Sequence, residues 1–435
     1  MMVSFSSLVI IAAVALAAPI TIGLTGLRLP AIVLEIVLGI AIGPQGLGWA
    51  KADEPVTVLS TIGLAFLLLL AGLEIDFQRL RGRLLRLAMS AYVVSFGLAA
   101  LIGLGLRAAD LVASPVLVAI ILSATSLGVI LPILKDAHQT ATPVGQAVIA
   151  GGSIAEVGPI VLLSLFFSGE SGGLGSKLAL LIAFIAFVGS VGLVILGFER
   201  STKISQTLLT LQDTTAEIRV RGAFLLLVLF AFLASKFGLE AILGSFLAGA
   251  IIKLVDRDKG MTHAYFHRKL EAAGFGIFVP IFFVTTGIKL DIASLFHGSA
   301  VLGRVPIFLV AILVVRAVPA IAYRSFAERG SELVAGGLLQ ATTLSLPVVA
   351  GQIGVNLHLI TPENYVALVC AGLLSVMLFP LVALTLLRRP TTPTQQLAST
   401  TLSEEHVDQV LGTGPRRGRD AAFPGGSSPT SITRS

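Results

Sequence analysis

About thirteen apolar stretches, most of them close to twenty residues long, occupy the chain from its start to residue 387. A helix of about 20 apolar residues is long enough to cross a bilayer. Hydrophobic residues make up 55% of the chain and charged residues 12%, whereas a soluble domain carries roughly 25% charged residues. The sequence therefore predicts an all-α polytopic membrane protein with about 13 transmembrane helices. The stretches are 3–24, 30–48, 55–76, 87–106, 115–134, 143–168, 178–198, 219–236, 239–255, 275–296, 301–323, 332–354 and 364–387.

Composition also changes after the last stretch. We expect residues 1–389 to form one membrane domain, and residues 390–435 to form a disordered cytoplasmic tail. The tail is rich in Pro, Thr, Ser, Gly and Arg, a composition that cannot bury enough apolar surface to fold.

Lys and Arg are distributed unevenly between the two sides of the predicted bundle. With thirteen spans, the loops after odd-numbered spans and the C-terminus share one side. That side holds roughly four times as many basic residues as the other, and such a bias marks the cytoplasmic side. We therefore expect a multi-pass protein of the cell (plasma or inner) membrane, with its N-terminus outside and its C-terminus in the cytoplasm. The net charge of +6 is then a feature of membrane orientation, and no nucleic-acid partner is expected.

Glu156 is a lone carboxylate in the middle of the stretch 144–167. An ionised acid at bilayer depth costs several kcal/mol or more, so an acid that stays there usually serves an ion or proton path. The alternative is a structural acid that is hydrogen-bonded to a neighbouring helix. Arg316 is the other charge that the sequence places at bilayer depth. We expect it to have a structural or electrostatic role, and the alternative is a side chain that extends to the interface.

Two distant segments resemble each other. Residues 122–127 read LSATSL and precede Pro132, and residues 339–344 read LQATTL and precede Pro347. With thirteen spans the two segments cross the membrane in opposite directions, as in inverted-repeat transporters. Hydroxyl side chains can satisfy backbone groups where a helix breaks, and proline removes a donor there. The pair therefore predicts two broken helices, although a six-residue match can also arise by chance in such a composition.

Four segments then resemble one family in the right order. They are GIAIGPQGL at 39–47, FLLLLAGLEID at 66–76, LGSFLAG at 243–249 and VPIFFVTTG at 279–287. Over residues 8–388 the chain resembles a monovalent cation:proton antiporter of the Kef and sodium/proton exchanger type. The resemblance implies an inverted-repeat fold with two broken helices that cross at the bilayer centre. It also implies interleaved core and dimerisation subdomains, and hence a homodimer.

The resemblance places Glu156 on the carboxylate position of the family's sixth helix, and Arg316 on a basic position of its eleventh. Ala155 stands where the family carries Asp or Asn, so a second titratable group is missing at that position. Carboxylate, hydroxyl and carbonyl oxygens suit a hard monovalent cation. Pro159 is expected to free the Ala155 carbonyl as one such ligand. The remaining expected cation and proton ligands are Ser153, Thr125, Ser126, Thr342 and Thr343.

These residues favour a secondary transporter that exchanges Na+ or K+ for H+ by alternating access. With one carboxylate as the shared cation and proton site, the exchange is expected to be electroneutral. Two alternatives remain: a K+ channel-like efflux protein, and a sodium-coupled organic solute symporter of related fold. The single cysteine, Cys370, rules out a disulfide or cysteine metal cluster within the chain. We expect no enzyme activity, no cofactor, and no metal beyond the transported cation.

Overall fold

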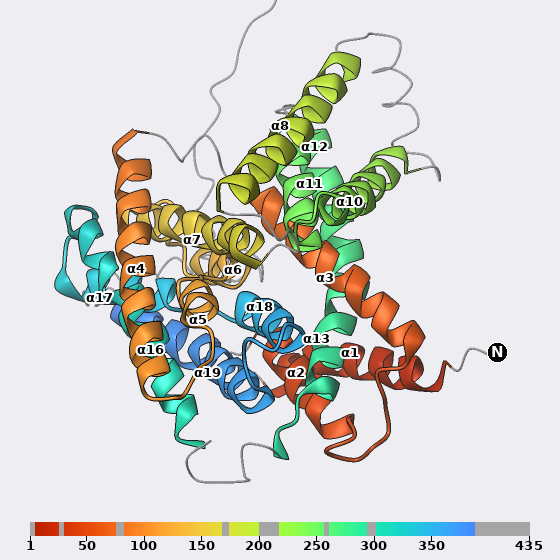
Figure 1. Cartoon of the computed structure of the whole chain (residues 1–435), viewed down its shortest axis with the longest axis horizontal. Coiled ribbons are helices and arrows are strands. Elements are labelled where there is room, and N and C mark those ends of the chain that lie inside the picture. The colour runs from red at the N-terminus through yellow and green to blue at the C-terminus, as the bar shows by residue number, and fades with distance from the viewer. Residues whose placement is uncertain are drawn as a thin grey trace, which may run out of the picture. The chain divides into compact units, whose positions relative to one another are not determined.

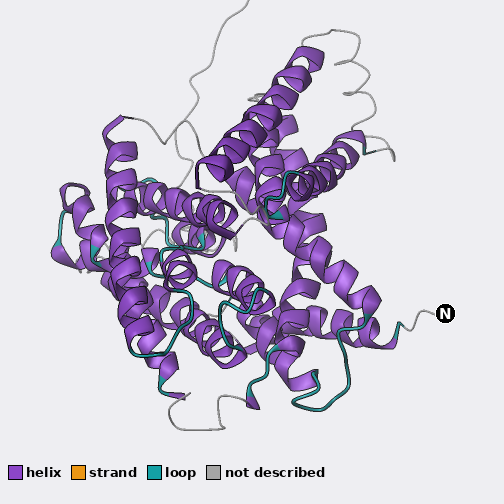
Figure 2. Cartoon of the chain, in the orientation of Figure 1, coloured by secondary structure: helices purple, strands orange, loops and turns teal. Residues whose placement is uncertain are grey.

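The computed structural model describes residues 5–25, 30–74, 82–167, 174–199, 217–255, 261–293 and 302–387. Helices and connecting loops account for this part of the chain, which contains no strand (Figure 2). The all-α class expected from the sequence is confirmed. The proposed tail, residues 390–435, lies outside the described residues.

The helices form two bundles (Figure 1). The first bundle comprises α1 (Ser6–Thr25), α2 (Ala31–Ile42), α3 (Glu54–Glu74), α10 (Ile218–Lys236), α11 (Ala241–Val255) and α13 (Val279–Lys289). The amphipathic helix α12 (Met261–Ala273) and the π-helical turn η1 (Gly274–Phe278) lead into α13.

The second bundle comprises α4 (Gly82–Ala108), α5 (Pro115–Leu122), α6 (Leu127–Asp136), α7 (Pro143–Phe167), α16 (Arg304–Ala317), the 3-10 helix η2 (Pro319–Phe326), α17 (Gly330–Gln340), α18 (Ser345–Asn356) and α19 (Pro362–Leu387). Helix α8 (Leu174–Glu199) contacts α7 of the second bundle and α11 of the first.

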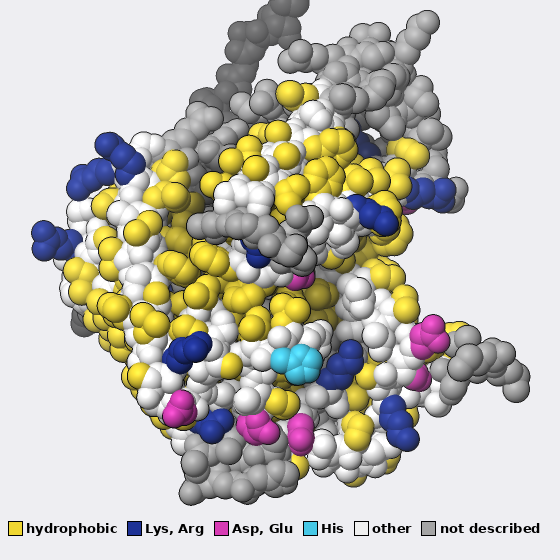
Figure 3. All heavy atoms as spheres, in the orientation of Figure 1, with side chains coloured by type: hydrophobic (Ala, Val, Ile, Leu, Met, Phe, Trp, Pro, Cys, Tyr) yellow, Lys and Arg dark blue, Asp and Glu magenta, His cyan; other side chains and the backbone are white. Residues whose placement is uncertain are grey.

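Among the described residues, nine helices are long and apolar enough to cross a membrane, or ten if the bent pair α16 and η2 counts as one span. Three shorter apolar segments, at 31–42, 115–131 and 241–254, lie where the sequence predicted further spans. Large apolar side chains such as Leu24, Leu193 and Leu225 are exposed, and apolar side chains cover much of the face shown in Figure 3. The chain is a multi-pass membrane protein, and the count of thirteen spans stays a prediction.

Two spans are broken at the hydroxyl-rich segments, as the sequence predicted. Residues 123–126 separate α5 from α6, and residues 341–344 separate α17 from α18. The two breaks contact each other: the backbone N–H of Ser126 donates to the carbonyl of Thr342 at 3.0 Å. The Ser126 hydroxyl accepts from the backbone N–H groups of Leu344 at 3.0 Å and Ser345 at 3.3 Å. Each break therefore satisfies backbone groups that the other leaves without a helical partner.

Close helix packing holds the first bundle together. Gly72 of α3 and Gly249 of α11 face each other's helix, and a Cβ at either position would overlap the facing backbone carbonyl. Small residues allow backbones in membrane bundles to approach in this way. This contact fixes the end of α3, and therefore the position of Glu74, its last residue.

Candidate functional site

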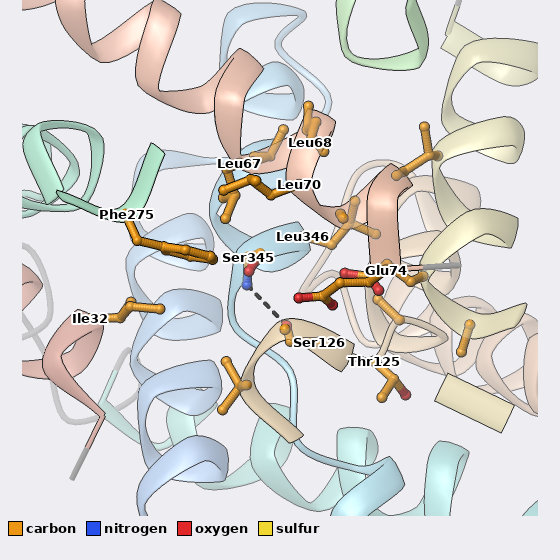
Figure 4. A pocket seen from close by; sticks show the side chains of 18 residues that line it. Ile32, Leu67, Leu68, Leu70, Glu74, Thr125, Ser126, Phe275, Ser345 and Leu346 are labelled. Atoms are coloured by element: carbon orange, nitrogen blue, oxygen red, sulfur yellow. Dashed lines mark hydrogen bonds between the residues drawn. The ribbon is translucent and has the colours of Figure 1, made fainter. Parts of the chain in front are cut away.

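A central cavity of about 50 Å³ lies where the two bundles meet at the broken helices. The first bundle contributes residues of α2, α3 and η1 to its lining. The second bundle contributes residues of the α5–α6 break, of α7 and of α18. Figure 4 shows these side chains, with Glu74 and Ser126 among them. The lining is mostly apolar, so its few oxygen atoms determine what can bind.

Glu156 projects from α7 into this cavity. Its carboxylate lies near the backbone N–H of Leu127, the first residue of α6. The N-terminus of a helix carries a partial positive charge, which favours an anion there. The break in the fifth span thus creates a backbone donor and a favourable field for the acid on α7.

Glu74 places a second carboxylate in the same cavity, from the opposite bundle. It is close enough to Glu156 for the two acids to interact electrostatically. Its Oε2 atom is buried and has no hydrogen-bond partner among the described residues. Gly128 of α6 faces both oxygens, since a Cβ there would lie 3.6 Å from each. The structure therefore brings together two acids that are 82 positions apart in the sequence.

Arg316 lies beside the broken helices, outside the lining of the central cavity, and is only 2% exposed. It donates to the hydroxyls of Thr125 at 2.8 Å and Ser95 at 2.9 Å, and to Oε1 of Gln340 at 3.1 Å. Its Nε also lies 3.4 Å from the carbonyl of Gln340, the last residue of α17. A cation beside the C-terminus of a helix offsets the partial negative charge there. The side chain is thus held inside the bundle and does not extend to an interface.

The hydroxyls named by the sequence occupy different positions. Thr125 and Ser126 line the central cavity, and Ser153, Thr342 and Thr343 do not. The Thr125 hydroxyl donates to the Gln340 carbonyl at 2.5 Å while it accepts from Arg316. The Ser153 hydroxyl donates to the Ile149 carbonyl at 2.8 Å, and that of Thr342 to the Leu338 carbonyl at 3.2 Å.

Two other expected cation ligands, the Thr343 hydroxyl and the Ala155 carbonyl, have different surroundings. The Thr343 hydroxyl is buried without a partner among the described residues. The Ala155 carbonyl, expected to be free because of Pro159, accepts from the backbone N–H of Thr125 at 3.2 Å. That contact ties α7 to the break between α5 and α6.

A second cavity, of about 500 Å³, adjoins the central one, and we call it the vestibule. Glu74, Gly128 and Phe275 line both cavities, so the vestibule leads to the two acids. Its other polar side chains are Lys135, Thr140, Lys253, His267 and Glu271. His267 and Glu271 of α12 approach within 3.2 Å. The amphipathic helix α12 thus supplies part of the wall of the vestibule.

No group of three or more His, Cys, Asp or Glu side chains that could hold a metal ion occurs within the described ranges. The two acids and the nearby hydroxyl and backbone oxygens are hard ligands, which suit a hard cation. Such ligands do not suit a soft transition metal.

Comparison with known proteins places this geometry in a family. The model of the transmembrane sodium/hydrogen exchanger matches residues 11–389. The chain belongs to the sodium/hydrogen exchanger family. This exchanger-family chain is 31% identical to YjbQ of Bacillus subtilis over 408 residues, which cover 90% of the chain and 65% of YjbQ. It is 27% identical to the Na(+)/H(+) antiporter of Enterococcus hirae, covering 81% of the chain and 91% of that protein.

The fold has a counterpart among solved structures. The sodium proton antiporter MjNhaP1 of Methanocaldococcus jannaschii superimposes on this exchanger-family chain with a TM-score of 0.64 at 20% identity. The superposition covers 88% of the chain and 99% of MjNhaP1. At this identity the likeness supports the fold, and the family resemblance inferred from the four motifs is confirmed by the family model.

Sequence reasoning missed two residues of this exchanger-family site, Glu74 and Ser345, and one buried acid outside it, Glu35. Glu74 was treated only as part of a family motif, although it ends an apolar stretch with a buried acid. Ser345 lines the central cavity at the start of α18. Glu35 is 5% exposed within α2. An acid inside an apolar stretch is a signal that the sequence does carry, so Glu35 and Glu74 were detectable in principle.

Proposed function

We propose that the chain exchanges a monovalent cation, Na+ or K+, for H+ across the membrane by alternating access. The observation that carries the proposal is the pair of acids, Glu156 and Glu74, which face one ion-sized cavity between two bundles. One acid belongs to each bundle, so relative movement of the bundles would open and close the site. The family membership and the relatives named as Na(+)/H(+) antiporters support the same activity.

The two acids together replace the single carboxylate that the sequence suggested. Two carboxylates in a small site do not both ionise readily, and such pairs share one proton. A pair with one proton carries one negative charge, which either one cation or one further proton neutralises. Exchange is then one for one and electroneutral. Arg316 and the hydroxyls of Thr125 and Ser126 hold the broken helices in the shape that this site needs.

Cavity size argues against an organic solute as cargo. About 50 Å³ of space accommodates a small ion or one or two water molecules, whereas pockets for organic ligands are about 300 Å³ or more. A channel would need a path open to both faces at once. Among the described residues, the vestibule of about 500 Å³ adjoins the central cavity of about 50 Å³ at Glu74, Gly128 and Phe275.

Orientation and assembly complete the proposal. Lys135 and Lys253 line the vestibule, and basic residues mark the cytoplasmic side, so the vestibule would face the cytoplasm. The N-terminus would then lie outside, with the C-terminus inside, in the plasma or inner membrane. We propose a homodimer, as the family resemblance implies, and lipid covers the remaining apolar surface.

Flux measurements in proteoliposomes test the activity. A pH-sensitive dye would report proton movement after addition of Na+, K+, Li+ or no cation. We expect a cation-dependent signal with Na+ or K+, and none in its absence. Proton movement that ignores the cation, or large single-channel currents, would exclude an antiporter.

A further inference from the structure

Glu35 is a buried acid that the exchange site described above does not use. It is 5% exposed, and its Oε2 atom has no hydrogen-bond partner among the described residues. An ionisable side chain inside a membrane bundle is costly to keep, so its presence suggests a function. Its helix, α2, also borders the central cavity through Ile32, which lies one turn before Glu35 (Figure 4).

The direction from Ile32 to Glu35 leads away from the vestibule. Helix α3 ends at Glu74 beside the vestibule. The short connection 43–53 joins the other end of α3 to the C-terminal end of α2. The direction of α13 leads to the same conclusion. This helix follows the turn that carries Phe275, a residue of the vestibule wall. It runs parallel to α2, because Gly39 faces Val284 and Gly43 faces Ile288. Glu35 is therefore further from the vestibule than the point where α2 meets the cavity.

A second unpartnered polar atom lies on the adjoining helix. The hydroxyl of Thr285 on α13 is fully buried and has no partner among the described residues. Gly39 lies about one turn beyond Glu35 on α2. It faces Val284 of α13, the residue just before Thr285. Buried polar atoms are nearly always hydrogen-bonded in a folded protein. Glu35 and Thr285 thus place two unpartnered polar atoms at successive distances from the vestibule, on two helices that pack together. We read them as parts of a polar path whose hydrogen bonds are not formed in this conformation.

We propose that Glu35 is a proton-relay residue between the Glu156–Glu74 pair and the face opposite the vestibule, with Thr285 beside it on the same path. Glu35 accepts a proton from that face, passes one to the acid pair, and returns to its starting state in each cycle. The relay leaves the one-for-one exchange unchanged, because no proton stays on Glu35. The inference rests on the proposed cation:proton exchange.

The substitution Glu35→Gln distinguishes a proton-relay role of Glu35 from a purely structural role. Glutamine imitates a permanently protonated carboxyl group, so a purely structural role would leave transport unchanged. The relay predicts that exchange slows about tenfold or more, since a positioned proton carrier contributes about 10²–10⁴-fold. Rates would be measured in right-side-out and everted membrane vesicles, with the pH of each face varied in turn. We expect the variant to lose its response to pH at the face opposite the vestibule, while its cation KM at the vestibule face stays unchanged.

Matched variants keep the test decisive. Glu35→Asp should retain the pH response, and Glu54→Gln, at an exposed acid in the first turn of α3, should behave as the wild type. A folded Glu35→Gln protein with wild-type rates and pH response overturns the relay. If Glu35→Gln does not fold, Thr285→Val and Thr285→Ser replace it. A slow Thr285→Val with a normal Thr285→Ser supports the path, and two normal variants overturn it.

Failure of the relay and failure of the exchange give different results. A wild-type protein without cation-dependent proton flux overturns the proposed function, and the relay falls with it. An active wild type, an inactive Glu156→Gln and a wild-type-like Glu35→Gln leave the exchange intact and overturn the relay alone.

Discussion

At the scale of single residues, the position of Glu156 shows how a broken helix makes an acid useful. Its carboxylate lies near the first N–H of α6, and the partial positive charge at a helix N-terminus favours an anion by about 0.3–1 kcal/mol. The break therefore offsets part of the cost of an ionised acid in a mostly apolar cavity. A carboxylate has about four acceptor sites, so a cation or a proton can still bind to Glu156.

Glu156→Gln should abolish exchange while the protein remains folded and inserted. The amide keeps the size of the side chain, but it carries no negative charge for a cation and releases no proton. Glu156→Asp should keep part of the activity with a shifted pH dependence, because the charge sits on a shorter side chain. Cation-dependent dye signals in proteoliposomes measure both variants. Wild-type flux in a monodisperse Glu156→Gln protein would exclude Glu156 as the shared site.

Glu74→Gln should leave exchange active but weaken cation binding. If the pair shares one proton, the amide imitates the protonated partner and removes only part of one ligand. Loss of one such interaction costs about 1 kcal/mol, which raises the cation KM roughly fivefold. Titration of flux against cation concentration gives the KM, with Glu54→Gln as the control. An unchanged KM would show that Glu74 does not contact the cation.

The residues of the site were predictable to different degrees. Glu156 and Arg316 are conspicuous because each interrupts a long apolar stretch near its middle. Glu74 ends its stretch, where an interfacial acid is common, and only the fold brings it to Glu156. Thr125 and Thr342 look equivalent in sequence, but Thr125 lines the cavity, whereas the Thr342 hydroxyl bonds back to the last turn of α17. Convergence of distant side chains depends on packing, which no local pattern contains.

At the scale of elements, the two broken helices are joined by unequal contacts. The Thr125 hydroxyl connects Arg316 to the end of α17, and the Ser126 hydroxyl accepts from two N–H groups at the start of α18. The break between α5 and α6 therefore supplies most of the side-chain bonds that join the pair. The sequence located both breaks, because hydroxyl clusters interrupt apolar stretches there.

The role of proline was less predictable. Pro132 and Pro347 lie within α6 and α18, after each break has ended. Pro159 lies inside α7, and the carbonyl that it leaves free is taken by Thr125. A proline predicts that a backbone bond is missing, but the partner that replaces this bond comes from another helix.

Thr125→Val and Thr342→Val should therefore differ. Thr125→Val leaves the Nε of the buried Arg316 with only its 3.4 Å contact to the Gln340 carbonyl, and loss of a hydrogen bond to a charged group costs about 1.5–3 kcal/mol. We expect a lower melting temperature in detergent and slower exchange. Thr342→Val removes only a local bond from the break to the last turn of α17, so stability and KM should stay close to wild type. Equal effects of both substitutions would contradict the unequal roles of the two breaks.

At the scale of the whole molecule, the cavity lies between two bundles that each contribute one acid. Apolar stretches and loop charges predict a membrane bundle, and the four motifs predict the family that the comparison confirms. They do not predict which helices form each bundle, because that depends on close approaches such as Gly72 to Gly249. The arrangement matters for transport, since a site divided between two bundles changes whenever they move.

The charge that crosses the membrane in each cycle tests this arrangement as a unit. If the acids share one proton, the loaded and the protonated site carry the same net charge, and exchange should ignore voltage. Proteoliposomes with a valinomycin-clamped potential and a Na+ gradient measure the rate at several voltages. If an inside-negative potential changes the rate through net charge movement, we would infer that both acids release a proton in each cycle. In that case Glu74→Gln would make the exchange independent of voltage, since only Glu156 would remain to titrate.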